Sequence, residues 1–179
     1  MAPAKQKKSS PTTMLYVFGG LPGTGKSTLA RHLAHMTGGM WLRIDSIEQA
    51  IRDHTDGLVG PEGYAAAQAV AVDNLRLGRV VIADSVNPLE ITRAAWLAVA
   101  SAAGTPSCEI EVICSDASEH RRRVEQRQSS VAGLKQPDWA AVQQRRCEPW
   151  VRPHLVIDTS GEEPAQSQAA LLRALGLRL

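Results

Sequence analysis

Short apolar runs rich in valine and isoleucine alternate along the chain with longer segments in which apolar residues recur at helical spacing. The short runs predict five strands, over residues 15–19, 40–44, 79–83, 109–114 and 155–157. The periodic segments predict seven helices, over about residues 26–36, 46–54, 63–77, 89–103, 117–128, 138–147 and 164–175. Because strands that alternate with helices are typical of βαβ units, we expect an α/β fold with a doubly wound, mostly parallel sheet.

Residues 128–137, with the sequence QSSVAGLKQP, interrupt the helical pattern on either side with polar residues, glycine and proline. Loops of this length in compact domains are often functional. We expect the segment to be a small mobile lid that covers a bound ligand.

A chain of 179 residues with 44% hydrophobic residues can bury one sizeable core, which predicts a single domain over residues 14–179. Residues 1–13 carry three lysines but no apolar run, and are expected to be a disordered basic tail and not a signal peptide. No stretch approaches the roughly 18 apolar residues of a membrane span. The three cysteines lack metal-ligand spacing, and are expected to be free thiols in a reducing cytoplasm.

The charge of the chain gives no sign of a nucleic-acid-binding face. The net charge is +2, and Lys5, Lys7 and Lys8 of the tail contribute three positive charges, which leaves −1 on the rest of the chain. Proteins that grip long nucleic acids usually present a strongly basic face. Aromatic residues, at 4%, also provide few platforms for base stacking. We therefore expect no tight binding of nucleic acids.

The strongest motif is the run GLPGTGKS at residues 20–27, which matches GxxxxGK[ST] between a predicted strand and a predicted helix. Glycines in such a loop let backbone N–H groups point at phosphate oxygens, and the following helix adds the positive end of its dipole. Lys26 is expected to reach the β- and γ-phosphates of ATP, and the Ser27 hydroxyl to ligate Mg²⁺. The residues expected to bind the nucleotide here are Gly20, Leu21, Pro22, Gly23, Thr24, Gly25, Lys26, Ser27 and Thr28.

Two aspartates follow predicted strands, at the edge of the sheet where ligands of doubly wound folds bind. Asp45 follows residues 40–44, and we interpret it as a general base that accepts the proton of an acceptor hydroxyl. The alternative is a helix N-cap, because Asp45, Ser46 and Glu48 form a capping-like pattern, in which Ser46 could cap instead.

Asp84 follows four apolar residues, as the carboxylate of a Walker B motif does, and could hold Mg²⁺ directly or through water. It is therefore a second candidate catalytic residue, and the sequence leaves open which of the two aspartates is the base. Its alternative is a turn residue, because Asn87 and Pro88 follow it. Ser85 stands where many motor-type ATPases carry a water-activating glutamate, which counts against a pure ATPase.

Two arginines lie just before the expected lid. Arg123 and Arg127 are four residues apart, hence on one face of the predicted helix, and could close over ATP and neutralise charge on the transferring phosphoryl group. We assign nucleotide binding to Arg123 and catalysis to Arg127. The alternative is a solvated helix face paired with glutamates, which we prefer for Arg121 and Arg122.

Four features together resemble a known family: GLPGTGKST, a strand that ends in RID, the run VVIADSVNP with a following arginine and tryptophan, and the helix RVEQR. This combination is similar to the small P-loop "predicted kinase" or AAA_33-type proteins, a group related to gluconate kinase, chloramphenicol phosphotransferase and the kinase domain of polynucleotide kinase. The resemblance implies a three-layer P-loop NTPase fold with a five-stranded parallel sheet of order 2-3-1-4-5. It also implies a catalytic base at Asp45 and lid or nucleotide arginines at Arg123 and Arg127.

The sequence departs from polynucleotide kinases at Glu48, where those enzymes commonly carry an arginine that holds the substrate's phosphate. We therefore expect an ATP- and Mg²⁺-dependent kinase that phosphorylates a hydroxyl of a small metabolite or antibiotic, as a monomer or homodimer. A kinase for nucleotide or polynucleotide ends, and a P-loop ATPase or switch without an acceptor, remain the alternatives.

Overall fold

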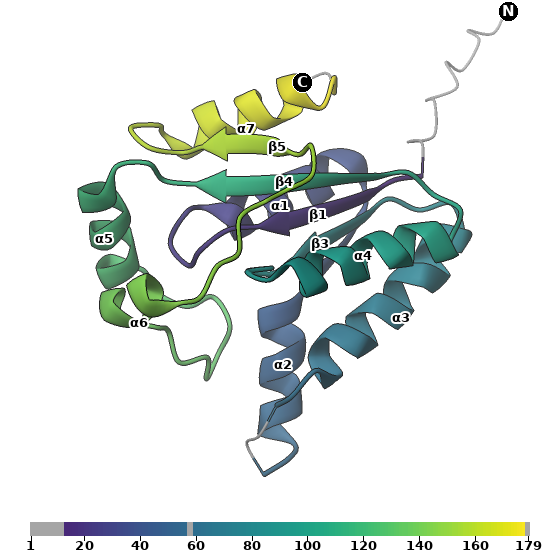
Figure 1. The fold of residues 1–179 in the computed structure, drawn as a ribbon, viewed down its shortest axis with the longest axis horizontal. Coiled ribbons are helices and arrows are strands. Elements are labelled where there is room, and N and C mark those ends of the chain that lie inside the picture. Colours follow the sequence, from purple (N-terminus) through teal and green to yellow (C-terminus); the bar gives the residue numbers. More distant parts are fainter. Residues whose placement is uncertain (1–12, 57–58, 178–179) are drawn as a thin grey trace, which may run out of the picture.

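The computed structural model describes residues 13–56 and 59–177, so the expected tail at residues 1–13 lies almost wholly outside the described residues. Its centre is one sheet whose strands are all parallel, in the order β2-β3-β1-β4-β5 (Figure 1). The strands are β1 (Leu15–Gly19), β2 (Met40–Arg43), β3 (Val81–Asp84), β4 (Ser107–Ile113) and β5 (Leu155–Asp158). The predicted fold class and strand order are confirmed.

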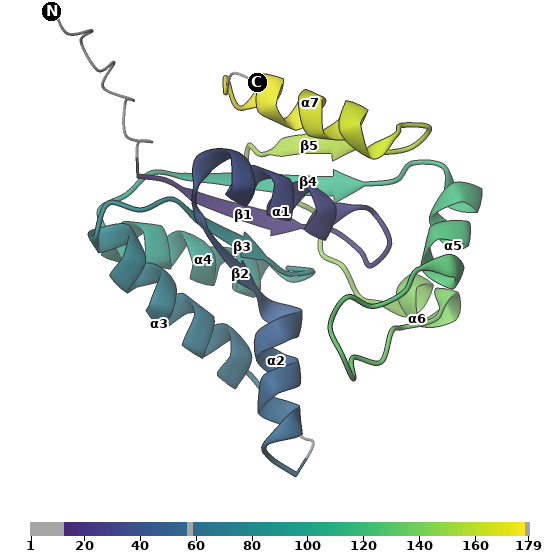
Figure 2. The same cartoon turned by 180° about the vertical axis from the view of Figure 1, so that it is seen from behind.

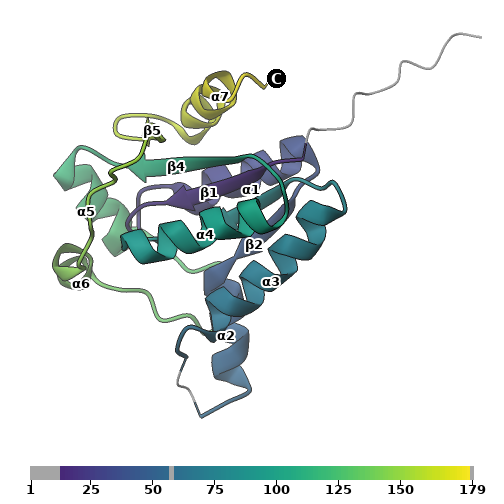
Figure 3. The same ribbon diagram turned by 45° about the vertical axis from the view of Figure 1, so that its right-hand side comes forward.

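Helices cover both faces of the sheet and make it the middle of three layers. One face carries α1 (Lys26–Thr37) and α7 (Pro164–Ala174), and the other carries α3 (Glu62–Arg76) and α4 (Glu90–Ala102) (Figures 1 and 2). Three further helices lie beyond the carboxyl ends of the strands: α2 (Ile44–Asp53), α5 (Ala117–Gln126) and α6 (Trp139–Gln144) (Figure 3).

Strand β1 shows why the strands read as continuous apolar runs. Tyr16 and Phe18 pack into the core under α1 and α7, whereas Leu15 and Val17 pack into the core under α3 and α4. All five residues of the strand are buried. A sheet covered on both faces needs apolar residues at every strand position, and not at alternate ones.

Most predicted boundaries lie within two residues of the observed ones, and two of the shifted boundaries concern site residues. Strand β2 ends at Arg43 and α2 begins at Ile44, so Asp45 lies in the first turn of a helix. Arg43 is the N-cap of α2 and no side chain caps it, so neither Asp45 nor Ser46 has the capping role considered above. Helix α5 ends at Gln126, because Arg127 has an extended backbone.

Helix α6 differs most from its predicted range, since it covers only Trp139–Gln144. Asp138 caps its start by accepting a hydrogen bond from the Ala141 N–H at 2.8 Å, and the backbone turns away at Arg145. Residues 145–154 then cross the face of the sheet toward β5 in an irregular conformation (Figure 1).

The described helices and the three cysteines can be compared with two expectations from the sequence. None of their helices has both the length and the apolar character needed to cross a lipid bilayer. The cysteines at positions 108, 114 and 147 are all free, as expected.

Candidate active site

The glycine-rich loop connects β1 to α1 and is shaped by backbone conformations that suit glycine. Gly23 and Gly25 have φ angles of 92° and 90°. A Cβ atom on Gly23 would lie 2.5 Å from Cγ2 of Val124 on α5, so both the backbone and the space require glycine. Gly25 is the N-cap of the twelve-residue helix α1, so the loop combines a tight backbone curl with a helix N-terminus.

Contacts from several elements hold this loop in its curled form. The Thr24 hydroxyl donates to the Leu21 carbonyl at 3.0 Å, and the Gly20 N–H donates to the Val86 carbonyl at 3.0 Å. On the far side, Nε2 of His120 on α5 lies 2.9 Å from the Pro22 carbonyl oxygen. The loop is therefore preorganised by protein contacts alone.

Lys26 and Asp84 form a buried ion pair directly beneath the loop. The Lys26 Nζ atom lies 2.8 Å from Asp84 Oδ1, and only 9% and 1% of the two side chains are exposed. The second oxygen of Asp84 accepts a hydrogen bond from the Trp41 indole N–H at 3.2 Å. Asp84 is the last residue of β3 and not part of a turn, and both of its oxygens are occupied by protein donors.

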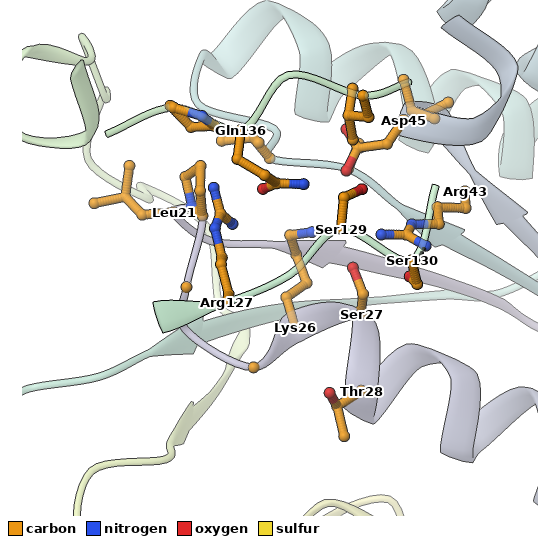
Figure 4. Close-up of a pocket in the computed structure, with 18 of the residues that line it drawn as sticks. Leu21, Lys26, Ser27, Thr28, Arg43, Asp45, Arg127, Ser129, Ser130 and Gln136 are labelled. Atoms are coloured by element: carbon orange, nitrogen blue, oxygen red, sulfur yellow. Dashed lines mark hydrogen bonds between the residues drawn. The ribbon is translucent and has the colours of Figure 1, made fainter. Parts of the chain in front are cut away.

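A cavity of about 850 Å³ opens above the loop, and most of the predicted site residues line it (Figure 4). The predicted residues on its wall are Leu21, Pro22, Gly23, Gly25, Lys26, Ser27, Thr28, Asp45, Arg123 and Arg127. Three predicted residues are not on this wall. Gly20 and Thr24 face a second cavity of about 500 Å³, and Asp84 lies beneath Lys26.

Asp45 enters the cavity from the first turn of α2. Within the described part of the chain its carboxylate forms no hydrogen bond or ion pair, although it is only partly exposed. A partly buried carboxylate without a protein donor remains available to a ligand that enters the cavity. Asp45 and Asp84 therefore differ sharply: one is free and the other is fully bonded.

Arg127 enters the cavity from the residue that follows α5. Its Nε and Nη2 atoms are buried and have no hydrogen-bond partner among the described residues. Burial lowers the pKa of the guanidinium, and the charge of Asp45 opposes that change. The side chain is thus a buried cation with unused donors on the wall of the cavity.

Arg123 also lines the cavity, but its guanidinium is already bonded. It donates to Glu119 Oε1 at 2.7 Å, to the Thr159 hydroxyl at 2.7 Å and to the Thr159 carbonyl at 2.8 Å. The pairing with glutamate considered for this helix thus extends to Arg123. Arg121 pairs with Glu125 as expected.

Five charged residues line the far side of the cavity. Glu48 and Arg52 of α2 are two that the sequence places after Asp45, whereas Arg43, Lys135 and Arg145 carry no signal in the sequence that marks them as site residues. Arg52 pairs with Glu48 at 3.2 Å, and burial raises the pKa of the Glu48 carboxyl more than the Arg52 charge lowers it. The sequence of α2 shows the four-residue spacing of that pair, but it gives no sign that Arg145 approaches.

The segment at residues 128–137 forms one wall of the cavity and reaches across to α2. The Ser130 hydroxyl accepts a hydrogen bond from Nη1 of Arg43 at 2.8 Å. A Cβ atom on Gly133 would lie 3.1 Å from Nε2 of Gln49 on α2. The segment expected to be a lid therefore lies between α5 and α6 and contacts the opposite side of the cavity, with Ser129, Ser130 and Gln136 on its inner face (Figure 4).

The donor set fits a magnesium ion that takes few protein ligands. Among residues 13–56 and 59–177 there is no cluster of three or more histidine, cysteine or acidic side chains that could hold a metal ion. Mg²⁺ commonly keeps several waters and is held by one or two protein oxygens together with substrate phosphates. The Ser27 hydroxyl on the cavity wall is such an oxygen, whereas Asp84 could act only through water while its present bonds persist.

Solved structures of kinases share the fold of this chain. A candidate kinase from Chloroflexus aurantiacus matches with a TM-score of 0.72 and 20% identity, over 94% of this chain and 100% of that chain. The APS kinase CysC of Mycobacterium tuberculosis, in complex with AMPPNP and APS, has a TM-score of 0.68 and 17% identity over 93% and 99% of the two chains. A gluconokinase from Sinorhizobium meliloti has a TM-score of 0.59 and 16% identity over 92% and 97%.

Sequence comparison gives partial relatives and one family. Uncharacterised proteins of Mycobacterium tuberculosis and Mycobacterium bovis are 35% identical in an alignment of 86 residues, which covers 44% of this chain and only 17% of those relatives. The profile of the AAA_33 family, described as an AAA domain, matches residues 15–149. Since that match covers well over half of the chain and includes the glycine-rich loop, the chain belongs to the AAA_33 family, as its resemblance in sequence predicted.

Proposed function

We propose that the protein is an ATP- and Mg²⁺-dependent kinase that transfers the γ-phosphoryl group to a hydroxyl of a small molecule. One observation carries the proposal: a preorganised phosphate loop, an unpaired carboxylate at Asp45 and an unpaired guanidinium at Arg127 line the same cavity. A kinase needs a phosphate cradle, a residue that orients the nucleophile and a cation for the developing charge.

The loop and the start of α1 would hold the phosphates of ATP. The backbone N–H groups of residues 23–27 and the helix N-terminus would provide the anion cradle, and Lys26 would exchange Asp84 for phosphate oxygens. The Ser27 hydroxyl would hold Mg²⁺, which when bound neutralises charge on the phosphates. Arg123 is close enough to line the nucleotide, but its bonds to Glu119 and Thr159 favour a positioning role.

Asp45 is the better candidate for the general base. A base must be able to accept a proton from the acceptor hydroxyl, and the Asp45 oxygens have no competing donor among the described residues. Asp84 is occupied by Lys26 and Trp41, which supports an indirect role in holding Lys26 or a metal-bound water. In the transfer, the acceptor oxygen would bond to phosphorus as ADP leaves with the electron pair of the broken bond, and the hydroxyl proton would pass to Asp45.

Arg127 and residues 128–137 would complete the site around the transferring group. The unused donors of Arg127 suit the charge that spreads over the phosphoryl oxygens in the transition state. The lid role of residues 128–137 is supported by their contacts with Arg43 and α2 across the cavity. Closure over the nucleotide would exclude water, and so favour transfer over hydrolysis.

The test is to incubate the protein with γ-labelled ATP and Mg²⁺ in the presence of panels of sugars, nucleosides, aminoglycosides and oligonucleotides, with transfer measured separately from phosphate release. We expect transfer to at least one small hydroxyl compound, at a rate above the rate of hydrolysis. ATP hydrolysis without transfer to any member would contradict the proposal in favour of an ATPase or switch. Transfer to oligonucleotide 5′-hydroxyls alone would support an end kinase.

A further inference from the structure

We propose that the acceptor half of the cavity binds an anionic group, so that the acceptor is a small hydroxyl compound that also carries a phosphate, sulfate or carboxylate. The inference rests on the proposed kinase function for its hydroxyl, but the anion site itself can be tested without any transfer. It concerns four basic residues, Arg43, Arg52, Lys135 and Arg145, which line the cavity together with the carboxylates Asp45 and Glu48.

The charges of this half do not balance. Arg52 and Glu48 pair with each other at 3.2 Å, which leaves one carboxylate, Asp45, against three basic side chains. None of those three basic side chains forms an ion pair in the part of the chain that the structure describes. Lys135 and Arg145 are exposed and Arg43 is partly buried, so water screens part of the repulsion between these cations, and a bound anion would remove more of it.

The nucleotide does not account for this surplus. The phosphate side already contains Lys26, Arg123 and Arg127. In Figure 4, Leu21 and Arg127 lie on one side of Lys26, and Arg43, Ser130 and Asp45 lie on the other. Arg43, which has no ion pair among the described residues, therefore lies on the same side of Lys26 as the carboxylate that we assign to the acceptor.

Of the three basic side chains without an ion pair, Arg43 has the best-defined contacts. Its guanidinium carbon lies 5.7 Å from the centre of the Trp41 ring, and its Nη1 donates to the Ser130 hydroxyl at 2.8 Å. Its Nε is buried without a hydrogen-bond partner. A guanidinium held in place by a ring and a hydroxyl, with a donor left over, is suited to an oxyanion, which accepts two hydrogen bonds from the planar fork.

Arg145 brings a second cation from a distant part of the chain. Arg145 is the C-cap of α6 and lines the cavity. Its charge lowers the pKa of the Glu48 carboxyl, although burial has the larger effect and raises that pKa overall. Glu48 lies at the position of α2 where polynucleotide kinases commonly carry an arginine. The structure brings Arg52 and Arg145 to the same place from other positions, so a glutamate there does not argue against an anionic acceptor.

The binding test uses sulfate and inorganic phosphate as probes. Protein saturated with a non-hydrolysable ATP analogue and Mg²⁺, so that the phosphate loop is filled, is titrated with each anion by calorimetry. We expect saturable binding that weakens as ionic strength rises, and a loss of affinity of about tenfold or more in the Arg43→Gln/Arg145→Gln variant. Arg121→Gln, on the exposed face of α5, is the matched control and should bind as the wild type does.

Anion binding that is absent, or that is equal in the double variant, would overturn the inference. A second arm compares transfer to acceptors that share a carbon skeleton: a nucleoside with its monophosphate, a sugar with its sugar acid and a diol with its monosulfate ester. The anionic member should be preferred by about tenfold, and the preference should disappear in the double variant. A preference for the neutral members, or for an oligonucleotide over a mononucleotide, would also overturn the inference. If anions bind but no compound is phosphorylated, the kinase proposal fails while the anion site stands.

Discussion

The charged side chains beneath and behind the glycine-rich loop, which we call the bonded side, have protein partners, whereas several on the wall of the large cavity, which we call the unbonded side, have none among the described residues. Lys26 and Asp84 hold each other beneath the loop. Arg93, on the wall of the second cavity, is 1% exposed and donates to the carbonyls of Asn87, Pro88, Glu148 and Pro149. On the wall of the large cavity, Asp45 and the Nε and Nη2 atoms of Arg127 lack partners in the part of the chain that the structure describes.

The difference separates residues that stabilise the fold from residues that are held ready for a ligand. Bonded polar groups contribute to stability, and their loss leaves buried partners unsatisfied. Unbonded groups near a binding site cost stability until a ligand satisfies them, so their removal should lower activity without lowering the free energy of unfolding. The two sides should therefore respond to substitution in opposite ways.

The largest expected effect is that of Lys26→Ala, which should abolish phosphoryl transfer, by a factor of about 10³ or more, because the loop loses its charge for the β- and γ-phosphates. The substitution also leaves the Asp84 carboxylate buried without a cation, which should lower the free energy of unfolding by about 3–5 kcal/mol. Transfer assays and thermal denaturation measure the two effects separately.

The double variant Lys26→Met/Asp84→Asn is the control for Lys26. It removes both charges of the buried pair, so it should regain stability while transfer remains absent. Wild-type turnover in either folded variant would contradict the assignment of the loop.

Arg93→Met should be the clearest purely structural loss on the bonded side. It removes the arginine donor from four backbone carbonyls, of which that of Pro88 still accepts from the Glu148 N–H. It also removes a guanidinium that lies 4.7 Å from the centre of the Trp150 ring, so we expect a destabilisation of about 3–5 kcal/mol. Arg173→Met, at an exposed position of α7, should change the melting temperature little. Similar melting temperatures for the two variants would show that Arg93 does not hold its surroundings together.

Asp45→Asn tests the unbonded side. It should lower kcat by about 10² or more, the usual scale for loss of a general base, while the affinity for ATP changes by no more than a few-fold. Because no described residue donates to Asp45, the melting temperature should stay the same or rise. A collapse of ATP binding together with turnover would indicate a magnesium or structural role.

Arg127→Ala should lower kcat by roughly tenfold and raise the KM for ATP less, since the charge it neutralises is greatest in the transition state. Its stability should not fall, because two of its buried nitrogen atoms have no partner to lose. Arg121→Ala, which breaks only an exposed pair with Glu125, serves as the matched control. If both variants had equal kinetic effects, the effect of Arg127 would come from the general charge near α5 and not from a specific contact with the transferring phosphoryl group.

The smallest effect concerns the lysines before residue 13. Any weak, salt-sensitive binding of single-stranded DNA or RNA should come from Lys5, Lys7 and Lys8, so deletion of residues 1–12 should remove it and leave ATP affinity unchanged. Micromolar or tighter binding of an oligonucleotide by the truncated protein, in a filter-binding assay at physiological salt, would contradict this expectation.

Much of the bonded side could be predicted from the sequence, because its contacts follow from local chemistry and strand order. The loop motif identifies Lys26 and Ser27, and the apolar run before Asp84 places that residue at a strand end. Once β2 and β3 are known to be neighbours, with Arg43 opposite Asp84, the bond between Trp41 and Asp84 is a diagonal contact on one face of the sheet.

The unbonded side could be predicted only in part. Asp45 and Arg127 were identified from their neighbours in sequence, although the helix boundaries beside both were wrong by a residue or two. Arg145 lies about a hundred residues from Arg43, and its approach depends on where α6 ends and how residues 128–137 cross the cavity. The spacing of apolar residues predicts neither the end of α6 nor the path of residues 128–137, because the path of an irregular segment depends on its tertiary contacts.

Transfer and hydrolysis are separated most sharply by the fraction of consumed ATP whose γ-phosphate ends on an organic acceptor, measured with the labelled nucleotide and the best acceptor of the panel. For a kinase with an acceptor site beside Asp45, we expect a fraction near one for the wild type at saturating acceptor. The transfer rate should fall by about 10² in Asp45→Asn, with the fold and ATP affinity retained. A fraction near zero for every acceptor, with the phosphate released to water, would contradict the claim that the unbonded side of the cavity serves an acceptor.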